Sequence, residues 1–134
     1  MLTAMQLHLV RHADAEPGEP DELRRLTVAG RRAARELGER LAREGVRPDA
    51  ILTSPLLRAR ETGDELAGQL GVQAEPYDRL APGATVADVR AALAGRGETV
   101  VVVGHQPDCG RIAAELTGGP EPRFPAAGHA ILEL

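Results

Sequence analysis

The sequence contains no lysine, and only two of its 134 residues are aromatic, Tyr77 and Phe124. The lack of lysine excludes a Walker-type phosphate loop and a Schiff-base lysine. With so few aromatic rings, a platform on which the bases of single-stranded nucleic acid could stack is not expected. The net charge of −4 provides no general attraction to nucleic acid or to an anionic membrane. We therefore expect neither nucleic acid nor membrane as a partner.

Cysteine is almost absent as well. Cys109 is the single cysteine, so an internal disulfide is impossible and a reducing compartment is the simplest setting. The first ten residues lack the basic segment and cleavage pattern of a signal peptide. The longest aliphatic stretch, 100–103, is far too short to cross a bilayer. These features predict a soluble cytoplasmic protein.

Alternating strand and helix patterns run through the whole chain, with no repeat and no linker. Strands are predicted at 5–10, 50–53, 72–75, 99–103 and 130–134. Helices are predicted at 27–44 and 54–71, from residue 85 to about 95, and over a short stretch that contains Ile112 and Leu116. The acidic segment 13–23 is predicted to be an irregular, mobile loop. The pattern indicates a single α/β domain over 1–134, built on a mainly parallel sheet flanked by helices.

Local signals mark where three of these helices begin. Thr27 is expected to be the N-cap of the first helix. Ser54 is expected to be the N-cap of the second, with Pro55 at its first helical position. Thr85 with Asp88 three residues later resembles a capping box.

Basic side chains follow the predicted strands at the points where those strands end. The first strand ends at Arg11 and His12, the strand 50–53 is followed by Ser54 and Arg58, and the strand 99–103 is followed by His105. Because ligands bind beyond the carboxyl ends of strands in open α/β sheets, these groups are expected to converge. Guanidinium forks match phosphate oxygens, and a helix beginning near residue 54 adds positive potential. The predicted ligand is a small dianion.

Four motifs carry a family resemblance. VRHADA (10–15), LTVAG (26–30), ILTSPLLRARET (51–62) and VVVVGHQP (100–107) occur in this order. The chain resembles the histidine phosphatase superfamily, which has the phosphoglycerate mutase-like fold, and most resembles its small SixA-type branch of phosphohistidine phosphatases. The resemblance implies a three-layer sandwich and a metal-independent phosphatase without cofactors.

The same resemblance implies roles for individual residues. His12 would be the nucleophile, and Arg11, Arg58 and a protonated His105 would surround the phosphoryl group. Ser54 and the backbone of Gln106 are further candidate phosphate contacts. A nucleophilic His12 must be neutral, which burial and the two guanidinium groups favour, and a backbone carbonyl is expected to hold its other ring nitrogen.

The sequence departs from the family pattern in two places. Ala13 stands where the family has glycine, so a positive φ there would be mildly strained. In the segment 79–86, where larger family members carry an acidic proton donor, this chain has no carboxylate. Asp14 is the candidate acid, with Glu16 and His129 as weaker choices.

Other histidines and Cys109 have simpler interpretations. His8 lies inside a strand and is expected to be a hydrogen-bonded core residue. The four histidines lack metal-ligand spacing, so no metal site is predicted. Cys109 lacks the arginine six residues later that a cysteine phosphatase would need, since position 115 is Glu.

Three functions remain open. The leading one is hydrolysis of phosphohistidine on a protein through a phosphorylated His12, which needs little acid assistance because a protonated imidazole leaves as a neutral amine. A phosphomonoesterase for a small metabolite is the second. A non-catalytic phosphate-binding or phosphocarrier module is the third, and turnover would distinguish it.

Overall fold

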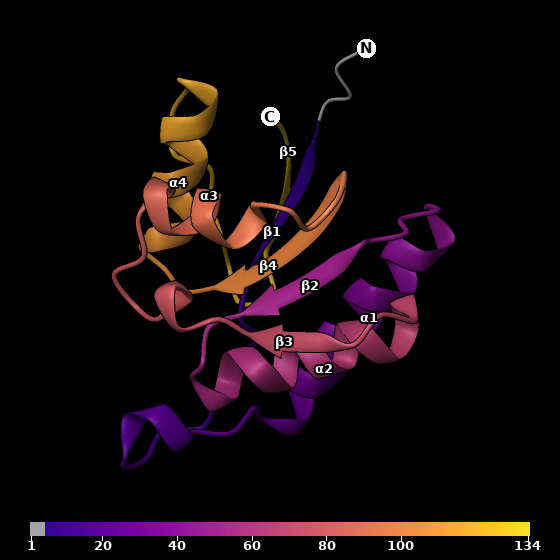
Figure 1. Cartoon of the computed structure of the whole chain (residues 1–134). Helices are drawn as coiled ribbons and strands as arrows, with labels where there is room; N and C mark the ends of the chain where they lie inside the picture. Colours follow the sequence, from indigo (N-terminus) through magenta and orange to yellow (C-terminus); the bar gives the residue numbers. More distant parts are fainter. Residues whose placement is uncertain (1–4) are drawn as a thin grey trace.

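The computed structural model describes residues 5–134 and contains one five-stranded sheet with helices on both faces (Figure 1). The strands are β1 (Gln6–Arg11), β2 (Ala50–Thr53), β3 (Ala74–Pro76), β4 (Thr99–Gly104) and β5 (His129–Glu133). The helices are α1 (Val28–Arg43), α2 (Leu57–Leu70), α3 (Val86–Leu93) and α4 (Asp108–Thr117), and short 3₁₀ helices span Asp21–Leu23 and Asp78–Leu80.

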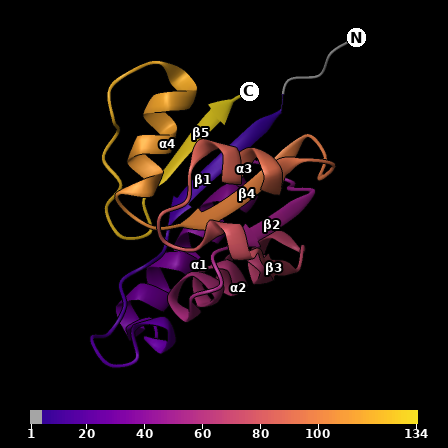
Figure 2. The ribbon, with the colours of Figure 1, turned by 60° about the vertical axis from the view of Figure 1, so that its left-hand side comes forward.

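The strand order is β3-β2-β4-β1-β5. The first four strands in this order are parallel neighbours, and β5 pairs antiparallel with β1 at the edge. Figure 1 shows α1 and α2 on one side of the sheet and α3 and α4 on the other, and the turned view in Figure 2 shows α3 lying across β4. The predicted three-layer α/β fold with a mainly parallel sheet is confirmed.

The two faces of β4 explain why its sequence is apolar throughout. Val101 and Val103 join the hydrophobic cluster beneath α1 and α2, whereas Val100 and Val102 join the cluster beneath α3 and α4. All four side chains are at most 1% exposed. A central parallel strand that is covered on both faces requires this run of β-branched residues.

Two of the three predicted N-cap residues are confirmed by the structure. The Thr27 side chain accepts a hydrogen bond from the backbone N–H of Gly30, and Thr85 forms a full capping box with Asp88. The prediction for Ser54 and Pro55 is wrong, because α2 begins at Leu57 and Ser54 is not its N-cap. The Ser54 hydroxyl instead lies 2.8 Å from a ring nitrogen of His105.

The acidic segment after β1 is more ordered than its composition predicts. An isolated bridge pairs Ala15 with Leu26, and the backbone N–H of Glu16 donates to the carbonyl of Arg25 at 2.8 Å. A 3₁₀ turn begins at Asp21. In Figure 1 this indigo segment extends beyond the arrowheads of the sheet, and it therefore stands at the carboxyl ends of the strands.

Gly30 allows α1 to approach the backbone just after His12. A Cβ built at this position would collide with the carbonyl oxygen of Asp14. This close approach explains why the last position of the LTVAG motif is glycine, since any side chain there would collide with the backbone of Asp14.

None of the helices within residues 5–134 is long and apolar enough to cross a membrane.

Candidate active site

Parallel strand ends bring the predicted side chains to one edge of the sheet. Arg11 is the last residue of β1 and is in register with Gly104 of β4. The backbone N–H of His12 donates to the carbonyl of Gly104 at 2.9 Å, and that of Ser54 donates to Val103 at 2.9 Å. His105 is the first residue after β4. The convergence expected from the strand ends is therefore present in the fold.

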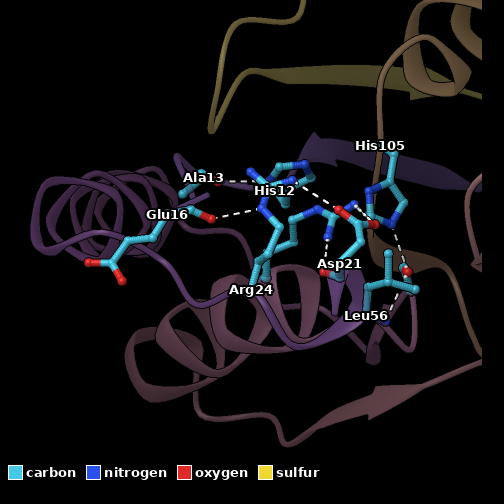
Figure 3. Close-up of polar contacts among 9 residues, drawn as sticks. His12, Ala13, Glu16, Asp21, Arg24, Leu56 and His105 are labelled. Carbon is cyan, nitrogen blue, oxygen red and sulfur yellow. Dashed lines mark hydrogen bonds and ion pairs between the residues drawn. The ribbon is translucent and has the colours of Figure 1, made fainter. Parts of the chain in front are cut away.

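The imidazole rings of His12 and His105 lie together, with their centroids 5.1 Å apart and their planes tilted by 60° (Figure 3). Nδ1 of His12 is 2.7 Å from the carbonyl oxygen of Ala13. A carbonyl can only accept, so Nδ1 carries the proton in this bond and the lone pair lies on Nε2. The predicted backbone carbonyl is thus identified as that of Ala13.

The surroundings of His12 keep its ring neutral. Burial lowers the pKa of His12 below 6.5, and the positive charges of Arg58, Arg11 and Arg24 lower it further. The hydrogen bond to Ala13 acts in the opposite direction but does not reverse the shift. The direction predicted from the sequence is confirmed, with burial as the larger cause.

The surroundings of His105 disfavour its charged form even more strongly than those of His12. Burial, followed by the proximity of His12 and Arg58, lowers the pKa of His105 to about 3. Its side chain is only 4% exposed, and its Nε2 is bonded to the Ser54 hydroxyl. His105 is therefore neutral in this structure, and its protonation beside a bound phosphoryl group, as expected from the sequence, stays a prediction. Such a ring can offer one N–H to an anion.

The guanidinium groups of Arg11 and Arg58 each have one N–H donor that lacks a hydrogen-bond partner within residues 5–134. Among the residues that the structure describes, Nε of Arg11 and Nε of Arg58 are buried polar atoms with no hydrogen-bond partner. Arg58 as a whole is only 7% exposed. Arg11 is anchored by one bond from its NH1 to the carbonyl of Phe124 at 3.0 Å. Buried charged donors without partners are unfavourable, so this edge of the sheet is suited to an anion that would accept from both.

Two residues of the loop after β1 reach the site without having been predicted. Asp21 contacts Arg58 through both its carboxylate and its backbone oxygen, and it also contacts Arg24 (Figure 3). The bonds to Arg24 and then to Arg58 lower the pKa of Asp21. The only signal in the sequence was an acid and an arginine three residues apart in a segment that resembled a solvated loop.

Ala13 does not need the conformation that glycine would provide. Ala127 is the one non-glycine residue with positive φ between residues 5 and 134, so the strain considered for Ala13 does not arise. Ala13 is fully buried, and its backbone N–H donates to the hydroxyl of Thr62 at 3.0 Å. Thr62 in turn donates to the carbonyl of Arg58 at 2.8 Å. This buried threonine links the loop after β1 to α2, and the sequence did not single it out.

The other predicted site residues have structural contacts of their own. The Asp14 carboxylate accepts from the Thr27 hydroxyl at 3.2 Å, and no contact joins it to the imidazole or guanidinium groups described above. Ser54 is fully buried and supports His105. The side chain of Gln106 accepts from the backbone N–H of Gly110 at 2.8 Å, which leaves its own backbone amide as the predicted contact. Glu16 is exposed, and its backbone carbonyl accepts from Arg24.

His8 and His129 form a separate pair. Nδ1 of His8 lies 3.0 Å from Nε2 of His129, and the two rings are stacked. His8 is fully buried and also bonds to the side chain of Gln6, so its interpretation as a hydrogen-bonded core residue is confirmed. His129 is therefore engaged on β5 and makes no contact with His12. Within residues 5–134, no group of three or more His, Cys, Asp or Glu side chains is arranged to hold a metal ion.

Comparison with known proteins identifies the family. Residues 7–82, more than half of the chain, match the histidine phosphatase superfamily (branch 1). The phosphohistidine phosphatase SixA of Escherichia coli (strain K12) is 34% identical over 125 residues, which cover 88% of this chain and 78% of SixA. The chain belongs to the histidine phosphatase superfamily.

Two further similarities refine this assignment. An uncharacterized protein of Picosynechococcus sp. is 37% identical over 123 residues, covering 86% of this chain and 74% of the relative. The solved structure of the protein histidine phosphatase SixA complexed with tungstate is 33% identical, has a TM-score of 0.86, and covers 95% of this chain and 86% of its own. The chain is a phosphatase of the SixA-type branch.

The protonation states of the histidines can be measured by an NMR titration of the imidazole Cε1 protons. We expect His12 to titrate with a midpoint below 6.5, because burial and the neighbouring arginines disfavour its charged form. His105 and His129 should stay neutral between about pH 5 and 8, because burial and a neighbouring imidazole lower the pKa of His105 to about 3 and that of His129 to about 4. A single His→Gln variant for each ring assigns the signals. A midpoint for His12 at or above 6.5 would contradict the electrostatics described here.

Proposed function

We propose that this phosphatase hydrolyses phosphohistidine on a protein, through a covalent intermediate in which His12 carries the phosphoryl group. One observation supports this most directly. The buried Nε atoms of Arg11 and Arg58 have no partner among residues 5–134, and both guanidinium charges act on a neutral His12 whose Nε2 holds a lone pair. The site thus combines an anion-binding pair with a nitrogen nucleophile.

The guanidinium groups would hold the equatorial oxygens of the phosphoryl group. Planar forks are suited to two oxygens at once, and the transition state of phosphoryl transfer spreads its charge over these oxygens. His105 would add a neutral N–H donor, held in place by Ser54. The backbone amide of Gln106 is a further candidate. Removing one such donor typically lowers the rate by ~10²–10³.

In the first step, Nε2 of His12 attacks phosphorus in line. The phosphorus–nitrogen bond of the substrate breaks, and its electron pair stays on the leaving imidazole. A ring that is protonated on its other nitrogen then departs as neutral imidazole, and no proton transfer is required. The Nδ1–H bond to Ala13 stabilises the positive charge that His12 acquires.

In the second step, water attacks the phosphorus of phosphorylated His12. The bond to Nε2 breaks, His12 returns to its neutral form with the proton on Nδ1, and both protons of water leave on dihydrogen phosphate. The positive charge of the two arginines and the N–H of His105 are sufficient for both steps, so we propose that the reaction is independent of metal ions and cofactors.

Two observations favour phosphohistidine over an ester. SixA of Escherichia coli, which is 34% identical to this chain over 88% of its length, is called a phosphohistidine phosphatase. In addition, the Asp14 carboxylate is bonded to Thr27 and is not poised beside His12, whereas an alkoxide leaving group would need an acid. We also propose that the protein acts in the cytoplasm, where we expect such a substrate.

The function can be tested by parallel assays in buffer containing EDTA. The substrates are a protein phosphorylated on histidine, p-nitrophenyl phosphate and a panel of sugar phosphates. We expect the highest kcat/KM on the phosphohistidine protein, and we expect His12→Ala to abolish turnover because the nucleophile is lost.

A matched control is His8→Gln, which removes a buried imidazole away from the site and should retain activity in the fraction that folds. A preference for sugar phosphates would favour the metabolite phosphatase. Stable phosphorylation of His12 without phosphate release would favour the carrier module. Equal rates for the wild type and His12→Ala would contradict the proposal that His12 is the nucleophile.

A separate test concerns Asp14, the acid suggested by the sequence, whose carboxylate is bonded to Thr27 in the structure. If this carboxylate protonates the leaving group, Asp14→Asn should slow a phosphomonoester with a poor leaving group more than a phosphohistidine substrate, by roughly the 10²–10⁴-fold of general acid catalysis. The measurement is kcat/KM on both substrates. Full activity of the variant on both would exclude Asp14 as the donor.

A further inference from the structure

The Asp21 carboxylate is built into the rim of the candidate active site. Its Oδ2 lies 3.2 Å from NH2 of Arg58, and its Oδ1 lies 3.1 Å from NH1 of Arg24. The backbone oxygen of Asp21 also accepts from NH1 of Arg58 at 2.9 Å. The Arg58 side chain is only 8% exposed, whereas that of Asp21 is 56% exposed. One side of this carboxylate thus meets the buried guanidinium, and the rest faces the solvent from which a substrate arrives.

The loop holds this carboxylate in a defined place. Asp21 begins the 3₁₀ turn, and the backbone N–H of Arg24 closes that turn on the Asp21 carbonyl. The Nε of Arg24 donates to the carbonyl of Glu16 at 2.7 Å, next to the bridge between Ala15 and Leu26. Arg24 is therefore fixed at both ends of its guanidinium, and it fixes Asp21 in turn.

Arg58 keeps donors for phosphate while it holds Asp21. NH1 and NH2 of a guanidinium carry two N–H groups each, and Asp21 takes one from each. The buried Nε of Arg58 has no partner in the described part of the chain. A phosphoryl group and the Asp21 carboxylate can therefore bind to different edges of the same guanidinium.

An ionised carboxylate beside an anion-binding site disfavours substrate binding unless the substrate carries a positive charge or a hydrogen-bond donor near that carboxylate. The bonds to Arg24 and Arg58 keep Asp21 in its charged form, so it repels a phosphoryl dianion and holds no proton to give to a leaving group at neutral pH. It can, however, accept a hydrogen bond from a cation. A phosphohistidine ring that is protonated on its unphosphorylated nitrogen supplies both a positive charge and an N–H donor, whereas a phosphate ester supplies neither.

We propose that Asp21 recognises the substrate imidazole by accepting a hydrogen bond from this N–H, and that it thereby selects phosphohistidine over phosphate esters. The proposal rests on the proposed function. As the phosphorus–nitrogen bond breaks, its electron pair moves onto the leaving nitrogen, and the ring departs neutral with its proton still on the nitrogen that faces Asp21. Asp21 neither gains nor loses a proton. Its charge keeps the substrate ring protonated, and the protonated ring is the form that leaves readily.

The test compares Asp21→Asn with the matched variant Glu22→Gln, which removes one charge from the same turn at a side chain that makes no ion pair or hydrogen bond within residues 5–134. The probes are a phosphohistidine peptide and p-nitrophenyl phosphate, whose leaving group needs no acid. The readout is the ratio of the two kcat/KM values. We expect Asp21→Asn to lower this ratio by roughly ten- to a hundredfold, the effect of a hydrogen bond to a charged group, and Glu22→Gln to leave it unchanged.

A pH profile provides a readout that a purely structural role would not change. For the wild type, activity on the phosphohistidine peptide should fall as the substrate ring loses its proton, and in Asp21→Asn this alkaline limb should move to lower pH. An equal loss on both probes would overturn the proposal, because Asp21 would then only position Arg58. An unchanged ratio would overturn it as well. A wild type inactive on the peptide but active on esters would contradict the proposed function itself, whatever Asp21 does.

Discussion

Two buried guanidinium nitrogens have no hydrogen-bond partner among residues 5–134, and the proposed function depends on them. A buried polar group without a hydrogen bond costs ~1–3 kcal/mol, and more when it is charged. Nε of Arg11 and Nε of Arg58 are both in this state. The fold tolerates them because the rest of each side chain is anchored, Arg11 on the carbonyl of Phe124 and Arg58 on Asp21. An oxyanion that accepts from both groups would remove this cost, and on this ground we propose that the site binds a phosphoryl group.

The neutrality of the two imidazoles follows from the same arrangement. Burial, followed by neighbouring positive charge, lowers the pKa values of His12 and His105, so that in the proposed mechanism one ring keeps a lone pair for attack and the other keeps a single N–H. The carbonyl of Ala13 holds the proton on Nδ1 of His12 and leaves Nε2 as the nitrogen that would attack in the proposed mechanism. In this account, the arginines that bind the substrate also prepare the nucleophile.

The sequence was sufficient for the features that depend on local pattern. The apolar run of β4 and the capping residues Thr27 and Thr85 predicted elements that are present, and strand ends predicted the convergence of His12 with His105. What failed depends on tertiary contacts. Ser54 has the side chain of an N-cap, but a buried histidine competes for its hydroxyl, and α2 begins three residues later.

Asp21, Arg24 and Thr62 could not be found by pattern for a related reason. Their importance lies in side-chain bonds between segments far apart in the chain, such as the one from Arg58 to Asp21. An acid and an arginine in a turn resemble any solvated loop until the fold places them against a buried guanidinium. Likewise, the depth to which His105 is buried, and therefore its lack of charge, follows from the packing of the whole sheet edge.

The most direct test of the account is a crystal structure with orthovanadate, which mimics a phosphoryl group in transfer. We predict that vanadium is bonded to Nε2 of His12 and that its oxygens accept hydrogen bonds from Nε of Arg11 and from Nε of Arg58. Vanadate bonded through Nδ1 of His12, or bound away from both guanidinium groups, would contradict it.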